Sequence, residues 1–419
     1  MKRLLVFLLL TAFFHVHAAE PITLKQCREW ARDNNPRMKQ SELQEAITRL
    51  RIQTNQAAWL PQIDLKAQAT YQSEVISIDI PIPGVTIDGP AKDQYRVYLD
   101  VKQTLWDGGL VREKNSLEKA LLETDCQKRE IDNRPWIVQV DEIYFGLLRA
   151  RLNERILIAR TEVLNQQLSR MENAKKEGAV RQKDVDMLKA EHLLLHQKRI
   201  ENESLGTSLC RVLSVITGRS IPDTLVPELP DIVSIRANQL LRPEYRYFEL
   251  QQKQIDQQSR LLSAARNPVV YAFGQAGYGR PGLNMLSATF DPYYLVGVGL
   301  TWRVFDWNTT LRGRKIHALQ QEAIGTLRSG FQQQQEVQLA EALEKVSRIE
   351  KLLETDRKML DLRRSIAQTA ASELENGTLT ATDYLIDLNA ETMSEIGYES
   401  RKIELLQAQY SVNTLLGND

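Results

Sequence analysis

Residues 95–109 read YRVYLDVKQTLWDGG, and residues 294–308 read YLVGVGLTWRVFDWN. In both stretches apolar side chains recur at every second position, at Tyr95, Val97, Leu99 and Val101 and again at Tyr294, Val296, Val298 and Leu300. Both stretches then contain an aspartate near their end, Asp107 and Asp306. This period of two predicts a β-strand with one apolar face. The two stretches lie 199 residues apart, so the chain repeats itself, and an internal repeat of this kind determines how a fold is built.

Further matches extend the repeat along the chain. Gly178 and Asp184 correspond to Gly377 and Asp383 at the same offset of 199. Earlier in the chain the offset is 207, and the matching pairs are Pro36 with Pro243, Pro61 with Pro268, and Tyr71 with Tyr278. The change from 207 to 199 falls between residues 72 and 94, where a surface loop can change length at low cost.

The chain starts with a pattern typical of an export signal. Two basic residues precede an apolar stretch over residues 4–14, and residues 16–18 fit a cleavage site. This three-part pattern predicts a secretory signal peptide over residues 1–18 and a protein that works outside the cytoplasm. A buried N-terminal helix is the alternative interpretation.

Charge and cysteine content exclude several classes of function. The 54 Lys and Arg residues balance 54 Asp and Glu residues, so there is no excess positive field to favour a nucleic-acid partner. Cys27, Cys126 and Cys210 are too few for a disulfide scaffold and show no metal-binding spacing. Beyond residue 20 no run of 18 apolar residues occurs, which excludes a transmembrane helix. A strand that crosses a bilayer needs no such run.

Each repeat also carries a helical pattern of unusual length. Steps of three and four from Val140 reach ten positions of which eight are apolar, and the counterparts from Leu339 give eight of ten again. This average spacing of 3.5 is typical of a coiled-coil seam. In the first copy Pro135 interrupts the pattern, with Asp132 and Asn133 as possible caps, so we expect a kink or a restart there.

These patterns predict a tandem organisation, with three prolines marking a linker between the copies. The first repeat covers residues 19–218, with a β-hairpin at 62–106, a long helix at 110–177 and a helix at 183–216; the linker covers 219–235; the second repeat covers 236–419, with a hairpin at 269–305, a long helix at 311–376 and a helix at 382–416.

Four strands from one chain cannot enclose water, because barrels of about eight strands already fill their own interior. Open sheet edges cannot face lipid either. If the strands span a membrane, several chains must therefore share one barrel. Two alternatives stay open: a half-buried sheet in a soluble protein, and a non-channel periplasmic coiled-coil protein that acts as an adaptor or a structural spacer.

A set of short motifs in fixed order resembles the TolC-like outer-membrane efflux family, also called outer membrane factors. The motifs are Thr23-Leu24 through Asn34-Asn35-Pro36, Trp59-Leu60-Pro61, Thr104-Leu105-Trp106-Asp107-Gly108-Gly109, and the paired turns at 178–184 and 377–383. The resemblance implies a mainly α-helical fold with a small transmembrane β part. Three chains would form one twelve-stranded barrel in the outer membrane, continued by a coiled-coil helical barrel into the periplasm.

The resemblance also implies partners and a function. The chain would form the exit duct of a tripartite efflux or type I secretion system, together with a periplasmic adaptor (membrane fusion protein) and an inner-membrane transporter. Its other contacts would be with two further copies and with outer-membrane lipid, and not with nucleic acid. No arrangement of residues supports catalysis, so we expect neither an enzyme nor a cofactor or metal site.

The two paired turns are the predicted functional site. A Gly that ends one helix and an Asp or Thr that starts the next is ordinary capping chemistry, and this is the simpler interpretation. The resemblance implies that the turns are periplasmic tips, and that the Tyr and Arg which lock the tip in the family are replaced here by Leu374 and Leu379. It assigns adaptor contacts to Gly178, Ala179, Val180, Gly377, Thr378 and Leu379, and a gate or selectivity role to Asp383, Asp387, Asp184 and Arg181.

Overall fold

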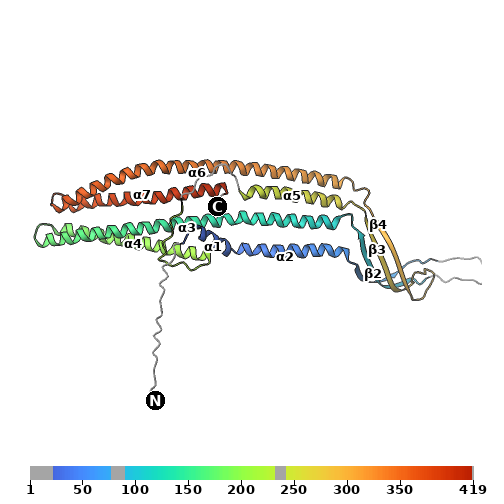
Figure 1. Ribbon diagram of the computed structural model, residues 1–419. Coiled ribbons are helices and arrows are strands. Elements are labelled where there is room, and N and C mark those ends of the chain that lie inside the picture. The colour runs from blue at the N-terminus through green and yellow to red at the C-terminus, as the bar shows by residue number, and fades with distance from the viewer. Residues whose placement is uncertain (1–21, 77–89, 232–241, 418–419) are drawn as a thin grey trace, which may run out of the picture. The chain divides into compact units, whose positions relative to one another are not determined.

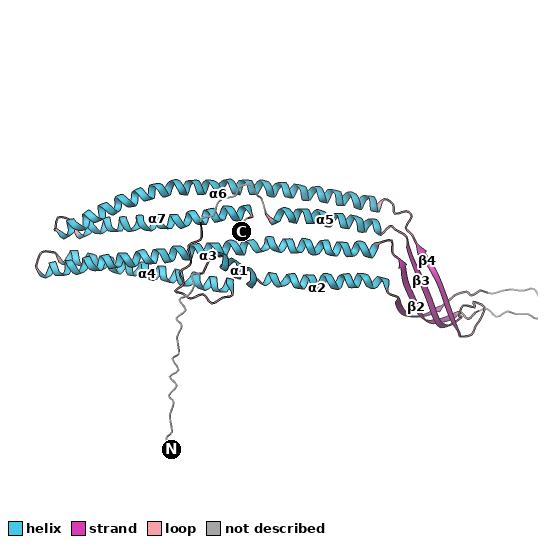
Figure 2. Cartoon of the chain, in the orientation of Figure 1, coloured by secondary structure: helices cyan, strands magenta, loops and turns pink. Residues whose placement is uncertain are grey.

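The computed structural model describes residues 22–76, 90–231 and 242–417. Most of these residues are helical, and four strands form a single sheet (Figure 2). The predicted fold class, mainly α-helical with a small β part, is confirmed. The predicted signal peptide, residues 77–89 of the surface loop expected between residues 72 and 94, and the end of the predicted linker lie outside the described residues.

The chain forms two compact units, and each unit contains segments of both repeats, so the units do not coincide with the repeats. The first unit comprises residues 1–38, 132–242 and 334–419, and the second comprises residues 39–131 and 243–333.

The sheet belongs to the second unit and is antiparallel throughout, in the order β1-β2-β3-β4 (Figure 1). Gln62 lies opposite Lys102 in the first hairpin, and their repeat counterparts Val269 and Thr301 lie opposite each other in the second. The two hairpins therefore share one register. The strands are β1 (Gln62–Tyr71), β2 (Asp93–Trp106), β3 (Val269–Arg280) and β4 (Asp291–Thr301).

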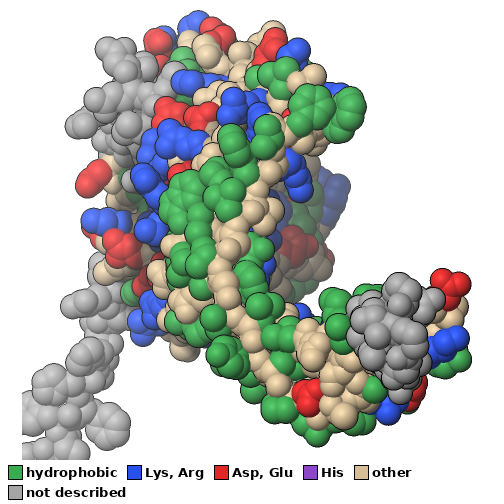
Figure 3. Space-filling view, turned by 90° about the vertical axis from the view of Figure 1, so that its right-hand side faces the viewer, with side chains coloured by type: hydrophobic (Ala, Val, Ile, Leu, Met, Phe, Trp, Pro, Cys, Tyr) green, Lys and Arg blue, Asp and Glu red, His purple; other side chains and the backbone are tan. Residues whose placement is uncertain are grey.

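One face of this sheet is apolar on all four strands. Val298 on β4 is 69% exposed and Leu65 on β1 is 72% exposed, although both are large apolar side chains. Figure 3 shows hydrophobic side chains gathered along the strands. A sheet in water would bury such a face, so this face requires an apolar environment. On three strands the face consists of Ile63, Leu65, Ala67 and Ala69; Tyr95, Val97, Leu99 and Val101; and Tyr294, Val296, Val298 and Leu300.

The opposite face is polar on the first hairpin and lined by aromatic rings on the second. Lys66 forms an ion pair with Asp100, which also accepts a 3.0 Å hydrogen bond from the Gln275 side chain. Phe273 lies across Gly297, where an added Cβ would come within 2.6 Å of the ring. Glycine is required there because the ring occupies the space of a side chain.

The helices of the second unit follow the same order as the strands. Asn55 donates to Asn115 at 3.1 Å, which joins α2 to α3, and Gln321 donates to Asp256 at 2.6 Å, which joins α6 to α5. A 2.7 Å ion pair between Lys253 and Glu123 joins α5 to α3. The helices are α2 (Pro36–Gln56), α3 (Leu110–Lys176), α5 (Pro243–Ala264) and α6 (Thr309–Glu375), with a short 3-10 turn, η1 (Ala57–Trp59), after α2.

An aspartate starts each long helix directly after a strand. Asp107 accepts hydrogen bonds from the backbone N–H groups of Gly109 at 2.8 Å and Val111 at 2.6 Å. Asp306 accepts one from the N–H of Thr310 at 3.0 Å, the position equivalent to Val111. These carboxylates satisfy donors that have no partner inside the helix, so the aspartates fix where each strand passes into its helix.

The first unit contains the remaining helices and three apolar clusters. Asn34 at the end of α1 donates to the carbonyl groups of Val215 and Ile216, which are the last acceptors of α4. Gly218 follows with a φ of 66°, and a Cβ there would meet the Asn34 side chain. The Asn34 side chain thus caps the C-terminal end of α4. The helices are α1 (Leu24–Asn34), α4 (Gln182–Thr217), α7 (Ala381–Leu416) and the later parts of α3 and α6.

Two expectations need correction. The predicted restart at Pro135 is wrong, because α3 runs through this proline as one helix, and the Asn133 side chain accepts a 2.8 Å bond from Asn35 instead of capping a new helix. The second hairpin ends at Thr301 and not at residue 305, because none of the strands in the described part of the chain lies opposite residues 302–305. None of the described helices has an apolar stretch sufficient to cross a bilayer.

We expect Asp107→Ala to lower the free energy of unfolding by about 1–2 kcal/mol, because two backbone donors at a buried helix start lose their acceptor. Asp107→Asn should lose less, since the amide oxygen can still accept one of the two bonds. Urea unfolding followed by circular dichroism measures both changes. An Asp107→Ala variant as stable as the native chain would contradict the capping role.

Candidate functional site

Both predicted turns have the same backbone geometry. The glycines adopt positive φ angles, 77° at Gly178 and 73° at Gly377. The N–H of Thr378 donates to the carbonyl of Glu373 at 3.0 Å, and its counterpart Ala179 makes the equivalent bond, also at 3.0 Å. This pattern ends a helix at a left-handed residue, a conformation that glycine adopts without steric cost.

The acidic residues lie in the first two turns of the following helices. Asp383 donates its N–H to the Thr380 hydroxyl oxygen at 3.3 Å, and that hydroxyl donates to the Asp383 carboxylate at 2.7 Å. Asp383 therefore takes part in a cap, as the simpler interpretation predicts. Arg181 occupies the equivalent start of α4 without a side-chain capping bond. Asp184 and Asp387 are half-buried.

The two turns pack onto one shared apolar cluster, the tip core. Leu374 is buried in it, and Val180 and Leu379 pack against it half-buried, whereas Ala179 and Thr378 are exposed. The predicted tip residues therefore divide into packing residues and surface residues. The buried members are Leu157, Leu164, Met171, Val185, Leu188, Leu195, Ala370, Leu374, Ala381, Tyr384, Leu385 and Leu388.

A buried charge cluster, not anticipated from the sequence, joins three helices above the tip core. Arg160 on α3 pairs with Glu391 at 2.8 Å and with Glu395 at 2.7 Å, both on α7. Arg364 on α6 approaches the same two carboxylates at 3.8 and 3.6 Å. The side chains of Arg160 and Glu391 are only 12% and 8% exposed. The one sequence signal was the spacing of the glutamates, four residues apart on one helix face.

Burial and pairing act in opposite directions on Arg160. Burial alone would lower the pKa of its guanidinium, but the hydrogen bonds to Glu391 and Glu395 outweigh it and hold the pKa above the ordinary value. The arginine is therefore charged at neutral pH. Separation of a buried ion pair leaves both charges without a partner, which is costly. The cluster therefore favours the alignment of α3, α6 and α7 that keeps its charges together.

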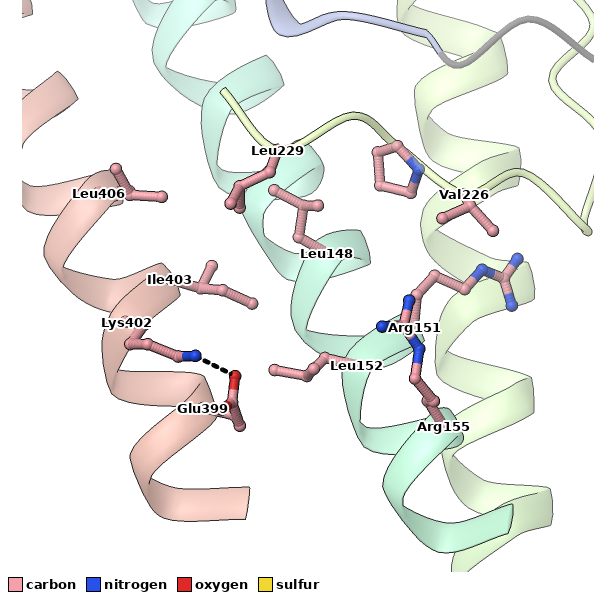
Figure 4. A pocket seen from close by; sticks show the side chains of 11 residues that line it. Leu148, Arg151, Leu152, Arg155, Val226, Leu229, Glu399, Lys402, Ile403 and Leu406 are labelled. Atoms are coloured by element: carbon pink, nitrogen blue, oxygen red, sulfur yellow. Dashed lines mark ion pairs between the residues drawn. The ribbon is translucent and has the colours of Figure 1, made fainter. Parts of the chain in front are cut away.

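The first unit also contains a cavity of about 270 Å³ between α3, α7 and the segment after α4 (Figure 4). Its walls include Leu148, Leu152 and Ile403. At its rim Lys402 and Glu399 form a 2.6 Å ion pair. The charged side chains of the lining are Arg151, Arg155, Lys402 and the single carboxylate Glu399.

Comparison with known proteins bears on this arrangement. A family model described as outer membrane efflux protein matches residues 28–202. The predicted resemblance to the outer-membrane efflux family is confirmed. This family transports and does not catalyse, which agrees with the prediction that the chain is not an enzyme, and its members reside in the outer membrane, as predicted. A search of curated proteins found no match.

Solved channels share the fold of this chain at low sequence identity. VceC from Vibrio cholerae has a TM-score of 0.67 at 14% identity, with 94% of this chain and 96% of that chain covered. MtrE from Neisseria gonorrhoeae, in its open state, scores 0.67 at 18% identity, with coverages of 94% and 88%. CmeC from Campylobacter jejuni scores 0.65 at 16% identity, with coverages of 94% and 85%. The likeness extends over nearly the whole described chain.

We expect Arg160→Met to lower the free energy of unfolding by about 3 kcal/mol, because Glu391 stays buried with only the more distant Arg364 as partner. Lys358→Met is the matched control. It removes a 2.8 Å pair with Glu354 whose side chains are more than 70% exposed, and it should cost less than about 0.5 kcal/mol. Equal urea midpoints for the two variants would contradict a structural role for the cluster.

Proposed function

We propose that three copies of this chain form an outer-membrane channel-tunnel that serves as the exit duct of a tripartite efflux or type I secretion system. The observation that carries the proposal is the sheet, which combines an exposed apolar face on all four strands with two unpaired edges. The family match and the fold support the outer-membrane location.

The two outer strands explain why more than one copy is needed. Among the described residues, β1 pairs only with β2, and β4 pairs only with β3. Backbone groups along a free edge cannot be left unpaired in lipid, so β4 of one copy must pair with β1 of another. Three copies of a four-stranded sheet supply twelve strands, which is enough to close a barrel around water. The apolar face then contacts lipid, and the polar and aromatic face lines the lumen.

The turns are the proposed periplasmic tips. The exposed Ala179 and Thr378, with the half-buried Val180 and Leu379, offer a small and weakly polar surface to a periplasmic adaptor. Gly178 and Gly377 shape that surface. Asp184, Asp383 and Asp387, with Arg181 beside them, would form charged rings when three copies meet at one axis. Carboxylates clustered in this way repel one another and attract cations.

Opening in this proposal is a shift between two arrangements of the tip helices. The tip core and the Arg160 cluster hold the α3–α4 pair against the α6–α7 pair. An adaptor opens the duct only if it binds the splayed arrangement more tightly than the closed one. The energy for export comes from the inner-membrane transporter, and the substrate is selected there.

We expect Val298→Lys to abolish or sharply reduce trimers in the outer membrane, since a lysine near the bilayer midplane costs about 2–4 kcal/mol per copy. Gln68→Lys, on the lumen face, is the control and should assemble normally. Membrane fractionation and chemical crosslinking measure both. A native chain recovered as a soluble periplasmic monomer would overturn the proposed function, and normal trimers of Val298→Lys would overturn the assigned lipid face.

We expect the double variant Asp383→Ala with Asp387→Ala to weaken cation selectivity, because the constriction loses two carboxylates per copy. The reversal potential across a planar bilayer under a salt gradient measures selectivity. Asp186→Ala, which removes an exposed tip carboxylate outside the proposed rings, should leave the potential unchanged. An unaltered potential in the double variant would place the constriction elsewhere.

A further inference from the structure

We propose that Arg303 of one copy forms an ion pair with Asp64 of the next, across a β4–β1 seam whose register copies the β2–β3 seam inside the chain. The inference rests on the proposed trimer and adds a defined residue contact to it. The chain's own repeat supplies the template, because its first repeat already contacts a second one.

The register follows from the repeat offsets. β4 corresponds to β2 at an offset of 199, β3 corresponds to β1 at an offset of 207, and both hairpins share one register. Inside the chain Thr104 on β2 lies opposite Tyr271 on β3. The counterpart of Thr104 is Arg303, and the counterpart of Tyr271 is Asp64. Repetition of the seam between copies places these two charged residues directly opposite each other.

The copied register keeps the two faces of the sheet intact. It sets Val298 opposite Ala69 of the next copy, with both on the apolar face, and leaves Arg303 and Asp64 together on the lumen face. A slip of one residue would bring apolar side chains against polar ones. A slip of two residues would set Arg303 opposite Gln62 or Lys66, which removes the opposite charge.

Both partners are available for this contact. Within residues 22–76, 90–231 and 242–417, Arg303 and Asp64 form no ion pair, and both are exposed. The nearby Lys66 is already paired with Asp100 of its own chain. Opposite residues in an antiparallel pair have Cβ atoms about 4.5–5.5 Å apart, within reach of an arginine and a carboxylate.

The helices beside the sheet also indicate that a second copy covers these edges. Leu250 on α5 is 5% exposed, whereas its counterpart Leu43 on the edge helix α2 is 63% exposed. Ala120 on α3 is 3% exposed, whereas its counterpart Leu319 on the edge helix α6 is 65% exposed. Positions that are buried on the inner helices α3 and α5 are thus exposed on the edge helices α2 and α6, as expected when another copy packs against the edge helices.

The early end of β4 has the same explanation. β2 continues to Trp106 because β3 lies opposite it as far as Val270. In the copied seam Phe305 lies opposite Ile63 of the next copy, so β4 gains a partner for residues 302–305. The strand then reaches the length predicted from the sequence.

The template ends at the turn into α6. In the first repeat Gly108 packs against Asn267, where an added Cβ would come within 2.4 Å of the Asn267 Cβ. The counterpart of Gly108 is Trp307, which holds a positive φ of 51° and is 77% exposed. A tryptophan cannot repeat that close contact, so the inferred register applies to the strands and not to this turn.

Cysteine pairs test the register in the full-length protein in membranes. Arg303→Cys with Asp64→Cys should give covalent dimers and trimers on oxidation, because directly opposite positions lie within disulfide reach. Arg303→Cys with Gln62→Cys moves the partner two residues along the same face, beyond that reach, and should link at least fivefold less. The native chain, whose Cys27 and Cys210 are buried, supplies the background.

Charge reversal tests the ion pair. Arg303→Asp should lower the temperature at which trimers dissociate in detergent, and addition of Asp64→Arg should restore it, whereas addition of Gln62→Arg should not. Equal rescue by Asp64→Arg and Gln62→Arg would overturn the inference, and so would stronger linking of the Arg303→Cys and Gln62→Cys pair. Crosslinked trimers would still support the proposed function in either case. Absence of trimers from the native chain would overturn the proposed function itself.

Discussion

The backbone groups on the free edges of β1 and β4 determine how this chain can exist. The sheet has an apolar face suited to lipid, but in lipid an unpaired N–H or C=O group costs several kcal/mol. Each edge strand presents a row of such groups, and the cost is largest where water cannot reach them. No rearrangement inside one chain removes both edges, since four strands are too few to curl into a closed barrel around water. In the proposed assembly, other copies therefore pair these edges.

The repeat turns this constraint into a simple assembly rule. The contact that each repeat makes with the following one inside the chain can be made again between chains. The two repeats show the same hairpin register, and Asp107 and Asp306 accept equivalent backbone hydrogen bonds at the starts of their helices. Where the repeats differ, as at Gly108 and Trp307, the contact between chains must differ from the contact within the chain.

Periodicity made most of the fold predictable from the sequence. The expected helix at 110–177 compares with Leu110–Lys176 in the structure, and the expected strand face is the exposed apolar one. The effect of Pro135 was misjudged because packing around a long helix can offset one lost hydrogen bond. Contacts between distant segments were not predictable: Asn34 on the end of α4, and Arg160 with Glu391, lie far apart in sequence and follow no local rule. The residues proposed for the gate could be located on the turns, but where their side chains point in the proposed trimer depends on contacts between copies, which the sequence of one copy does not predict.

The tip combines two kinds of contact that resist opening in different ways. The tip core is apolar and tolerates small sliding movements, since hydrophobic burial has no directional preference. The Arg160 cluster does not tolerate sliding, because each charged side chain needs partners within about 3–4 Å. Loss of one partner leaves a buried charge unpaired, which costs more free energy than the intact pair contributes. Helices that slide past one another can keep the apolar contacts of the tip core but must break the ion pairs of the Arg160 cluster. In the proposed opening, the charge cluster therefore defines the closed alignment, and an adaptor that splays α7 from α3 would have to compensate the buried arginine and glutamates that it separates.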